Sequence, residues 1–366
     1  MHSPDSAEFR RFWTEDRIDR SFVANAHRMM IGLRVAHDWS RIFGSLVVAG
    51  GRGKFLQIRH SQEMSVDVPD ELAARLQEIG NSGDSSLSKT IQAKQDLADF
   101  QAGLVERLSQ YAGKYVDRIL AVTVTDRGFW SSDFDGAILY QSACDPDRLA
   151  EIAGLSVIDA LPARDLAASG TGNFLDSLPL WFMFADRQLR GATSNSLALL
   201  LDRDPHWFLL PGSDGLDDLL PAIVSGRIFE DTQVRRLSNR LVAMVKACER
   251  PDAELPIGTA HVITDGPGPG VDSKNLIAPL EHAGIAVEFF KPTSELTPTE
   301  TIAARSTALL GLLFTDQLPT NIPDMTGATG LRLLGRLTPG KPFSWRNLLA
   351  VMADSQSTPM RLRDAI

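Results

Sequence analysis

Residues 31–59 contain three apolar runs: IGLRV at 31–35, IFGSLVVA at 42–49 and FLQIR at 55–59. The second and third runs are separated by Gly50-Gly51-Arg52-Gly53. Short runs rich in Val, Ile, Leu and Phe predict strands, and a glycine-rich connection of this length predicts a hairpin. This stretch therefore predicts the first strands of a β-sheet.

Two helices and a buried strand are predicted next. Pro69-Asp70-Glu71 opens a helix that carries apolar residues at helical spacing, and a longer helix follows around residues 97–108. Ile119–Val124 is wholly apolar apart from Thr123 and predicts a buried strand. The first third of the chain therefore reads β-β-β-α-α-β.

The second half has the same character. Its predicted strands are 197–201, 207–210, 261–264 and 285–289, and its predicted helices start near 217 and span about 234–248, 273–282 and 299–315. Two halves of this kind predict an α/β fold with two lobes and a cleft between them.

Composition limits the function classes. The chain has 366 residues, which suggests two domains, and its net charge of −9 argues against a nucleic-acid-binding protein. Its two cysteines, Cys144 and Cys248, form neither a disulfide framework nor a zinc spacing, so we expect a reduced, cytoplasmic compartment. No apolar run approaches the roughly 20 residues of a membrane-spanning helix, so no membrane association is expected.

Three stretches resemble one family. Residues 318–328, LPTNIPDMTGA, are similar to the C-terminal signature of the anhydro-N-acetylmuramic acid kinases. Residues 149–158, LAEIAGLSVI, lead into ARDLAASGTG at 163–172 and resemble the central segment of that family. Ile31-Gly32-Leu33, followed by a strand–turn–strand, resembles the opening of the family's chain. The resemblance can be laid over residues 31–340.

The resemblance implies two ribonuclease-H-like lobes of the actin, sugar-kinase and heat-shock-chaperone superfamily. It divides the chain into an arm at 1–30, lobe I at 31–186 with 318–340 packing back on it, lobe II at 187–317, and a tail helix at 341–366. It also implies ATP and Mg²⁺ as cofactors. Family members open the 1,6-anhydro ring of anhydro-N-acetylmuramic acid while phosphorylating O6, in the recycling of peptidoglycan.

The positions that match the family's phosphate and base motifs have changed. The first phosphate loop falls on Arg34–Arg41, which lacks the family's glycines and contains Trp39. The position of the family's catalytic Asp falls on Leu210, which cannot accept a proton. Asp214 and Asp217 lie nearby, and Asp214 is the candidate base if the chain is active.

The resemblance gives further candidates for the other parts of the site. The nucleotide loop falls on Gly266, Gly268 and Gly270, interrupted by two prolines that remove amide donors. Asp126 is the candidate metal ligand, and Arg164 with Asp165 is the candidate substrate-binding pair, although the two can equally form a structural pair. The family's sugar-binding Glu falls on Ala303, and Glu300 lies one turn away as a poor substitute.

Two functional hypotheses follow. The first is a kinase-family member that has lost most phosphoryl transfer and acts as a pseudokinase, a binding or regulatory protein for a cell-wall amino sugar. The second is an active, divergent sugar kinase whose base has moved to Asp214 or Asp217. A purely structural role with no small ligand is a third class. In it, a homodimer or another protein partner would contact the tail or the aromatic residues of the arm, which are Phe9, Phe12, Trp13 and Phe22. Docking of these residues on the chain's own body remains the simpler alternative.

Overall fold

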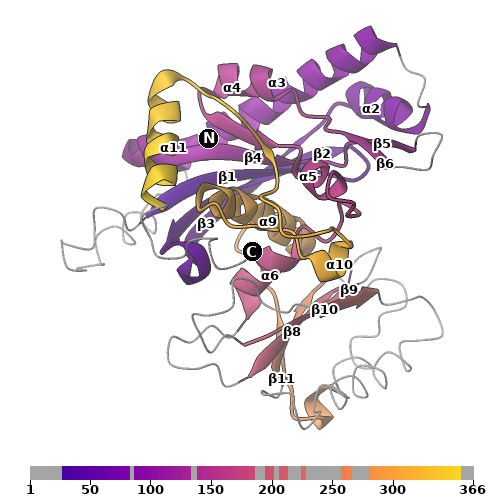
Figure 1. Ribbon diagram of the computed structural model, residues 1–366, viewed down its shortest axis with the longest axis vertical. Helices are drawn as coiled ribbons and strands as arrows, with labels where there is room; N and C mark the ends of the chain where they lie inside the picture. The colour runs from indigo at the N-terminus through magenta and orange to yellow at the C-terminus, as the bar shows by residue number, and fades with distance from the viewer. Residues whose placement is uncertain are drawn as a thin grey trace.

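The computed structural model describes residues 27–82, 86–132, 138–185, 194–201, 206–212, 224–227, 257–265, 278 and 280–355 of a mixed α/β protein (Figure 1). Its strands are β1 (Arg28–Val35), β2 (Arg41–Gly50), β3 (Gln57–Asp67), β4 (Ile119–Thr125), β5 (Phe129–Ser132), β6 (Ile138–Gln141), β7 (Ser156–Asp159), β8 (Asn195–Leu200), β9 (His206–Leu210), β10 (Val224–Arg227), β11 (Ile257–Ile263), β12 (Ala286–Phe289) and β13 (Arg336–Thr338). Its α-helices are α2 (Asp70–Ser82), α3 (Leu87–Ala112), α4 (Pro146–Ala153), α5 (Leu161–Leu166), α6 (Ser177–Phe184), α9 (Pro298–Thr315), α10 (Pro323–Thr326) and α11 (Pro342–Ser355). Two 3₁₀ helices are η2 (Gly53–Phe55) and η3 (Gly113–Arg118).

The six-stranded sheet has the order β13-β7-β4-β1-β2-β3. β1, β2 and β3 are antiparallel, β4 and β7 run parallel to β1, and β13 closes the edge antiparallel to β7. The predicted hairpin at the glycine turn is confirmed. The predicted boundaries need correction, because β1 begins three residues early at Arg28, Phe55 lies in η2, and β3 extends to Asp67.

The five-stranded sheet has the order β10-β9-β8-β11-β12. Its first three strands are antiparallel, and β11 and β12 run parallel to β8. It therefore repeats the order and the strand directions of β3-β2-β1-β4-β7. All four strands predicted for this half are confirmed. The helices predicted near 217 and at 234–248 lie outside the described residues.

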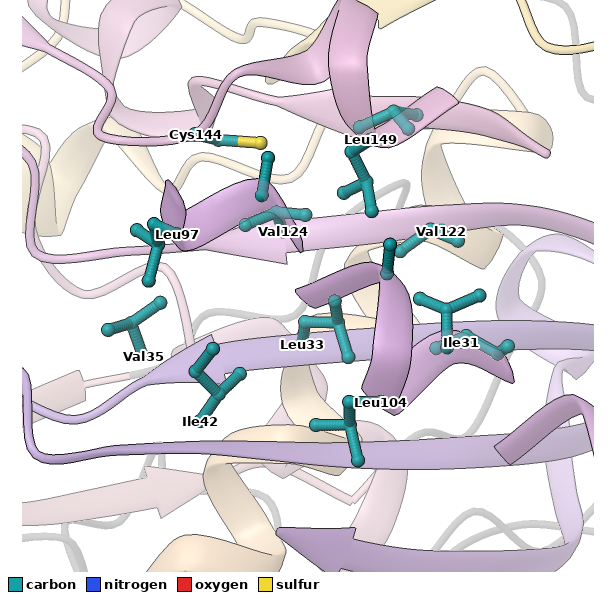
Figure 2. Packing of buried hydrophobic residues seen from close by; sticks show 14 of the residues in the cluster. Ile31, Leu33, Val35, Ile42, Leu97, Leu104, Val122, Val124, Cys144 and Leu149 are labelled. Atoms are coloured by element: carbon teal, nitrogen blue, oxygen red, sulfur yellow. The ribbon is translucent and has the colours of Figure 1, made fainter. Parts of the chain in front are cut away.

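Alternate residues of β1 face opposite sides of its sheet, as the two-residue period of a strand requires. Ile31, Leu33 and Val35 belong to a core with α2, α3 and α4, whose packing Figure 2 shows. Gly32 faces α9, where a Cβ would stand 2.2 Å from the backbone nitrogen of Ala308. Glycine is therefore required for the close approach of α9 to the sheet.

Helices connect the two sheets. α9 packs on β1, β2 and β4, and α6 contacts α9 as well as β8 and β9 (Figure 1). Apolar residues of α6 and of both sheets accordingly share one core cluster. The predicted tail helix is α11, and it packs on the body through fully buried Leu348. Within the described residues, no helix is both long and apolar enough to cross a membrane.

Candidate functional site

The turn between β1 and β2 occupies the position of the family's first phosphate loop. Two of its backbone amides donate within the turn: that of Ala36 to the Arg41 carbonyl at 2.8 Å and that of Trp39 to the Ala36 carbonyl at 3.0 Å. The Trp39 side chain is 1% exposed and stacks on Phe129 with ring centroids 5.8 Å apart. A phosphate cradle needs free amides and little side-chain bulk, and this turn offers an indole packed into the core.

Trp39 also has φ +65°, the left-handed region that strains any residue with a Cβ. The neighbouring Asp38 is exposed, and its Oδ1 accepts hydrogen bonds from the amide and hydroxyl of Ser40 at 3.1 and 2.6 Å. This side-chain turn holds the connection between the strands. Asp38 therefore has a structural role that requires no metal.

Asp126 directly follows β4 and is almost fully buried. Its Oδ2 accepts hydrogen bonds from the Ser142 hydroxyl at 2.9 Å and the Cys144 amide at 3.0 Å, and Tyr140 lies 3.4 Å from its Oδ1. Burial raises the pKa of the Asp126 carboxyl above its usual range, against the opposing effect of these hydrogen bonds. The carboxylate is thus engaged in holding the segment around the β5–β6 hairpin, and its proposed metal role stays a prediction.

Asp165 connects two of the family-like stretches. It is fully buried, and its Oδ1 accepts hydrogen bonds from the Asn321 amide group at 3.1 Å and the Thr326 hydroxyl at 2.9 Å. Its Oδ2 accepts from the backbone amide of Gly172 at 2.9 Å. The central segment and the C-terminal signature therefore meet at this carboxylate, which is fully committed to the fold.

Arg164, the other predicted substrate residue, is not paired with Asp165. Its side chain is exposed on α5, and within the described part of the chain it has no ion pair or hydrogen bond. Pro162 and Leu166 both lie against Gly172, on one side of the short helix, so Arg164, two residues from each, lies on another side. It remains an available cation.

The position that the resemblance assigns to the family's catalytic Asp lies in the second sheet. Leu210, at the end of β9, is 0% exposed and belongs to the core cluster shared with α6. Beyond it, the Pro211 carbonyl accepts from the Trp181 indole at 2.8 Å and the Gly212 amide donates to Asn195 Oδ1 at 2.8 Å. The candidate base Asp214 and the glycines at 266, 268 and 270 lie outside the described residues, so their predicted roles remain predictions.

Glu300, the substitute for the sugar-binding Glu, is already used. One of its oxygens accepts from Arg41 at 2.7 Å, and the other accepts from the Thr297 amide in a capping box at the start of α9. Ala303, at the family's Glu position, has no side-chain polar atom. Neither residue offers a free carboxylate to a sugar hydroxyl.

The sequence reasoning missed one ion pair at this edge of the sheet. Arg34, at the carboxyl end of β1, pairs with Asp176, the residue before α6. An arginine at the position of the phosphate loop therefore has its own internal anion. The partners are 142 residues apart, so no local spacing signals the contact.

The described residues do not fit ATP and Mg²⁺ well. In the turn after β1, the amides of Ala36 and Trp39 are engaged and the Trp39 side chain is buried, and Asp126 is buried among donors. In the described segments, no group of three or more His, Cys, Asp or Glu side chains is arranged to hold a metal ion. We therefore derive no phosphoryl-transfer step from this site.

Comparisons with known proteins give distant matches. The chain is 24% identical over 375 residues to the anhydro-N-acetylmuramic acid kinase of Bordetella petrii, covering 87% of this chain and 98% of that protein. No family model matches. An exopolyphosphatase structure from Cytophaga hutchinsonii is 10% identical with a TM-score of 0.27, covering 65% of this chain and 67% of that one. The sequence match supports the similarity to the kinase family that the quoted stretches indicate.

Proposed function

We propose that this chain is a divergent relative of the anhydro-N-acetylmuramic acid kinases that has lost phosphoryl transfer and acts as a binding or regulatory protein for a cell-wall amino sugar. In this proposal the two sheets of matching strand order belong to two ribonuclease-H-like lobes, and the sugar binds in a cleft between them. The protein would act in the cytoplasm, where peptidoglycan fragments are recycled.

The observation that carries the proposal is Trp39. A working phosphate loop presents backbone amides to the nucleotide, and here the amides of Ala36 and Trp39 close the turn on itself. The indole packs into the core, so removing it to reopen the loop would cost about 3–5 kcal/mol of stability. The turn is therefore stabilised in a form that does not suit phosphate.

Leu210 supports the same proposal. General-base catalysis needs a proton acceptor within hydrogen-bond reach of the attacking water. An aliphatic side chain in the shared core cannot take that role. A base elsewhere in the chain would have to reach the reacting atoms within about 1 Å of the required geometry.

Arg164 supports retained binding of an acidic sugar. Its guanidinium is exposed and has no partner in the described part of the chain, and the rigid Asp165 network fixes the helix that carries it. A muramic-type sugar bears a carboxylate, which a guanidinium can bind through two parallel hydrogen bonds. Ligand recognition could thus persist where phosphoryl transfer has not.

Two titrations and one rate measurement test the proposal. We expect calorimetry with 1,6-anhydro-N-acetylmuramic acid to show binding that Arg164→Gln weakens about 10- to 150-fold, since a hydrogen-bonded charge pair contributes about 1.5–3 kcal/mol. We expect no sugar phosphorylation above background with ATP and Mg²⁺. Turnover that either Asp214→Asn or Asp217→Asn abolishes would overturn the proposal and establish an active, divergent kinase.

A further inference from the structure

A groove of about 550 Å³ lies between α3, η3 and α4. Figure 1 shows α3 and α4 on the side of the six-stranded sheet opposite α9. Its apolar lining includes Ala102, Gly103, Val105, Val116, Ile152 and Leu155. Val116 and Ile152 are 41% and 50% exposed, which is high for aliphatic side chains that line the same groove.

Gly103 marks the open part of the groove. A Cβ placed on this residue would have no atom within 4 Å, so the helix surface here is free to receive a side chain from elsewhere. Glycine inside a helix costs about 0.5–1 kcal/mol relative to alanine. An uncovered glycine in the middle of a long helix is consistent with a surface that another segment approaches closely.

The rim of the groove carries two carboxylates, of which one is unpaired among the described residues. Asp99 is paired with Arg148 at 2.6 Å, whereas Glu106 is exposed and has no ion pair or hydrogen bond among the described residues. An apolar floor with an acidic rim favours an occupant that combines large apolar side chains with basic ones.

We propose that residues 9–13 of this same chain, Phe9-Arg10-Arg11-Phe12-Trp13, occupy the groove. The aromatic residues are spaced i, i+3 and i+4, which would place them on one side of a helical turn. Both arginines would then be available to the acidic rim. The segment thus has the apolar and basic side chains that the groove requires.

The entry point of the chain into the sheet makes this docking geometrically possible. Met29 in β1 pairs with Ile119, the first residue of β4, which directly follows η3 and therefore lies beside Val116 on the groove wall. Fourteen residues lie between Trp13 and Arg28. They can span about 22 Å as a helix or about 50 Å when extended, which is enough to reach across α3.

The test measures how fast trypsin cleaves the full-length chain after Arg10 and Arg11. Cleavage is carried out at low protein concentration, and mass spectrometry monitors the products. Gly103→Trp places an indole in the groove, from a Cβ position that has no atom within 4 Å. Phe12→Ala removes one of the aromatic side chains proposed to occupy the groove. We expect each variant to raise the cleavage rate at least tenfold. Ile91→Trp, on an exposed part of α3 outside the groove, should leave the rate unchanged.

Rapid cleavage of the wild-type arm, equal to that of Gly103→Trp, would overturn the proposal. Protection that rises with protein concentration together with a dimer in sedimentation velocity would also overturn it, because the occupant would then be the arm of a second copy. Circular dichroism and the unfolding midpoint of each variant confirm that a change in cleavage reports the arm and not general unfolding.

Discussion

Replacing Asp165 by Asn tests whether this buried carboxylate is an organiser of the fold. The three donors around it are the side chains of Asn321 and Thr326 and the backbone amide of Gly172. An asparagine keeps one carbonyl oxygen but turns an NH₂ group toward at least one of these donors. Because the site is 0% exposed, water cannot relieve the mismatch.

The magnitude follows from these contacts. One unsatisfied buried donor costs about 1–3 kcal/mol, and the remaining bonds lose the charge that made them roughly twice as strong as neutral ones. We therefore expect Asp165→Asn to lower the free energy of unfolding by about 2–4 kcal/mol. For a chain of 366 residues, whose unfolding entropy is about 2.1 cal/mol/K per residue, that corresponds to a loss of about 3–5 °C in the melting temperature.

The assay is chemical and thermal unfolding followed by circular dichroism, with Arg164→Gln as the matched variant. Arg164 is exposed and unpartnered in the described chain, so its loss should change stability by less than about 0.5 kcal/mol while weakening sugar binding. A destabilisation below 1 kcal/mol for Asp165→Asn, or an equal loss for Arg164→Gln, would refute the structural role assigned to Asp165.

Three further perturbations have defined outcomes. Gly32→Ala drives a methyl group into the backbone of α9, so we expect a loss of at least about 1–3 kcal/mol in denaturant unfolding, and an unchanged midpoint would contradict the close approach. The free energy of unfolding of Trp39→Gly should exceed that of Trp39→Ala by about 1 kcal/mol, because both variants lose the indole but only glycine relieves the left-handed strain. A lower free energy of unfolding for Trp39→Gly would contradict the left-handed conformation. Burial lowers the pKa of His261 despite the nearby Glu288, so the folded protein favours the neutral form. The free energy of unfolding should therefore fall as the pH drops below about 6.5, the ordinary pKa of an unfolded histidine, toward the lower pKa of the folded protein. A pH series of unfolding midpoints for wild type and His261→Phe measures this, and identical slopes for the two proteins between pH 7.5 and 5 would exclude His261 as the cause.

The elements that the sequence predicts well depend on local signals. The turn at Gly50–Gly53 lies between two apolar runs, and α3 repeats apolar residues at helical spacing, so neither requires knowledge of distant partners. β3 was predicted too short because it lies at the edge of its sheet. Most of its residues are only half buried, and an edge strand tolerates the polar run that follows Arg59.

The features that the sequence does not predict depend on distant contacts. Arg28 reads as part of a charged arm, but its backbone pairs with Ala49 in the sheet and its side chain forms a 2.5 Å ion pair with Asp316, 288 residues away. The structural role of Asp165 likewise depends on residues more than 150 positions later. The resemblance alone predicts that Leu210 falls on the position of the family's catalytic Asp, whereas the packing of Leu210 with α6 is seen only in the structure.

If phosphoryl transfer is lost, as we propose, the same contacts explain how the family-like stretches can persist. Asp165, Asn321 and Thr326 satisfy one another inside the protein, so their exchange carries a stability cost whether or not any ligand binds. Trp39 and Leu210 stand at positions where chemistry would require an open loop and a carboxylate, and both contribute apolar burial there instead. Signatures that connect the fold are therefore retained for a physical reason separate from catalysis, and their presence alone does not identify an active kinase.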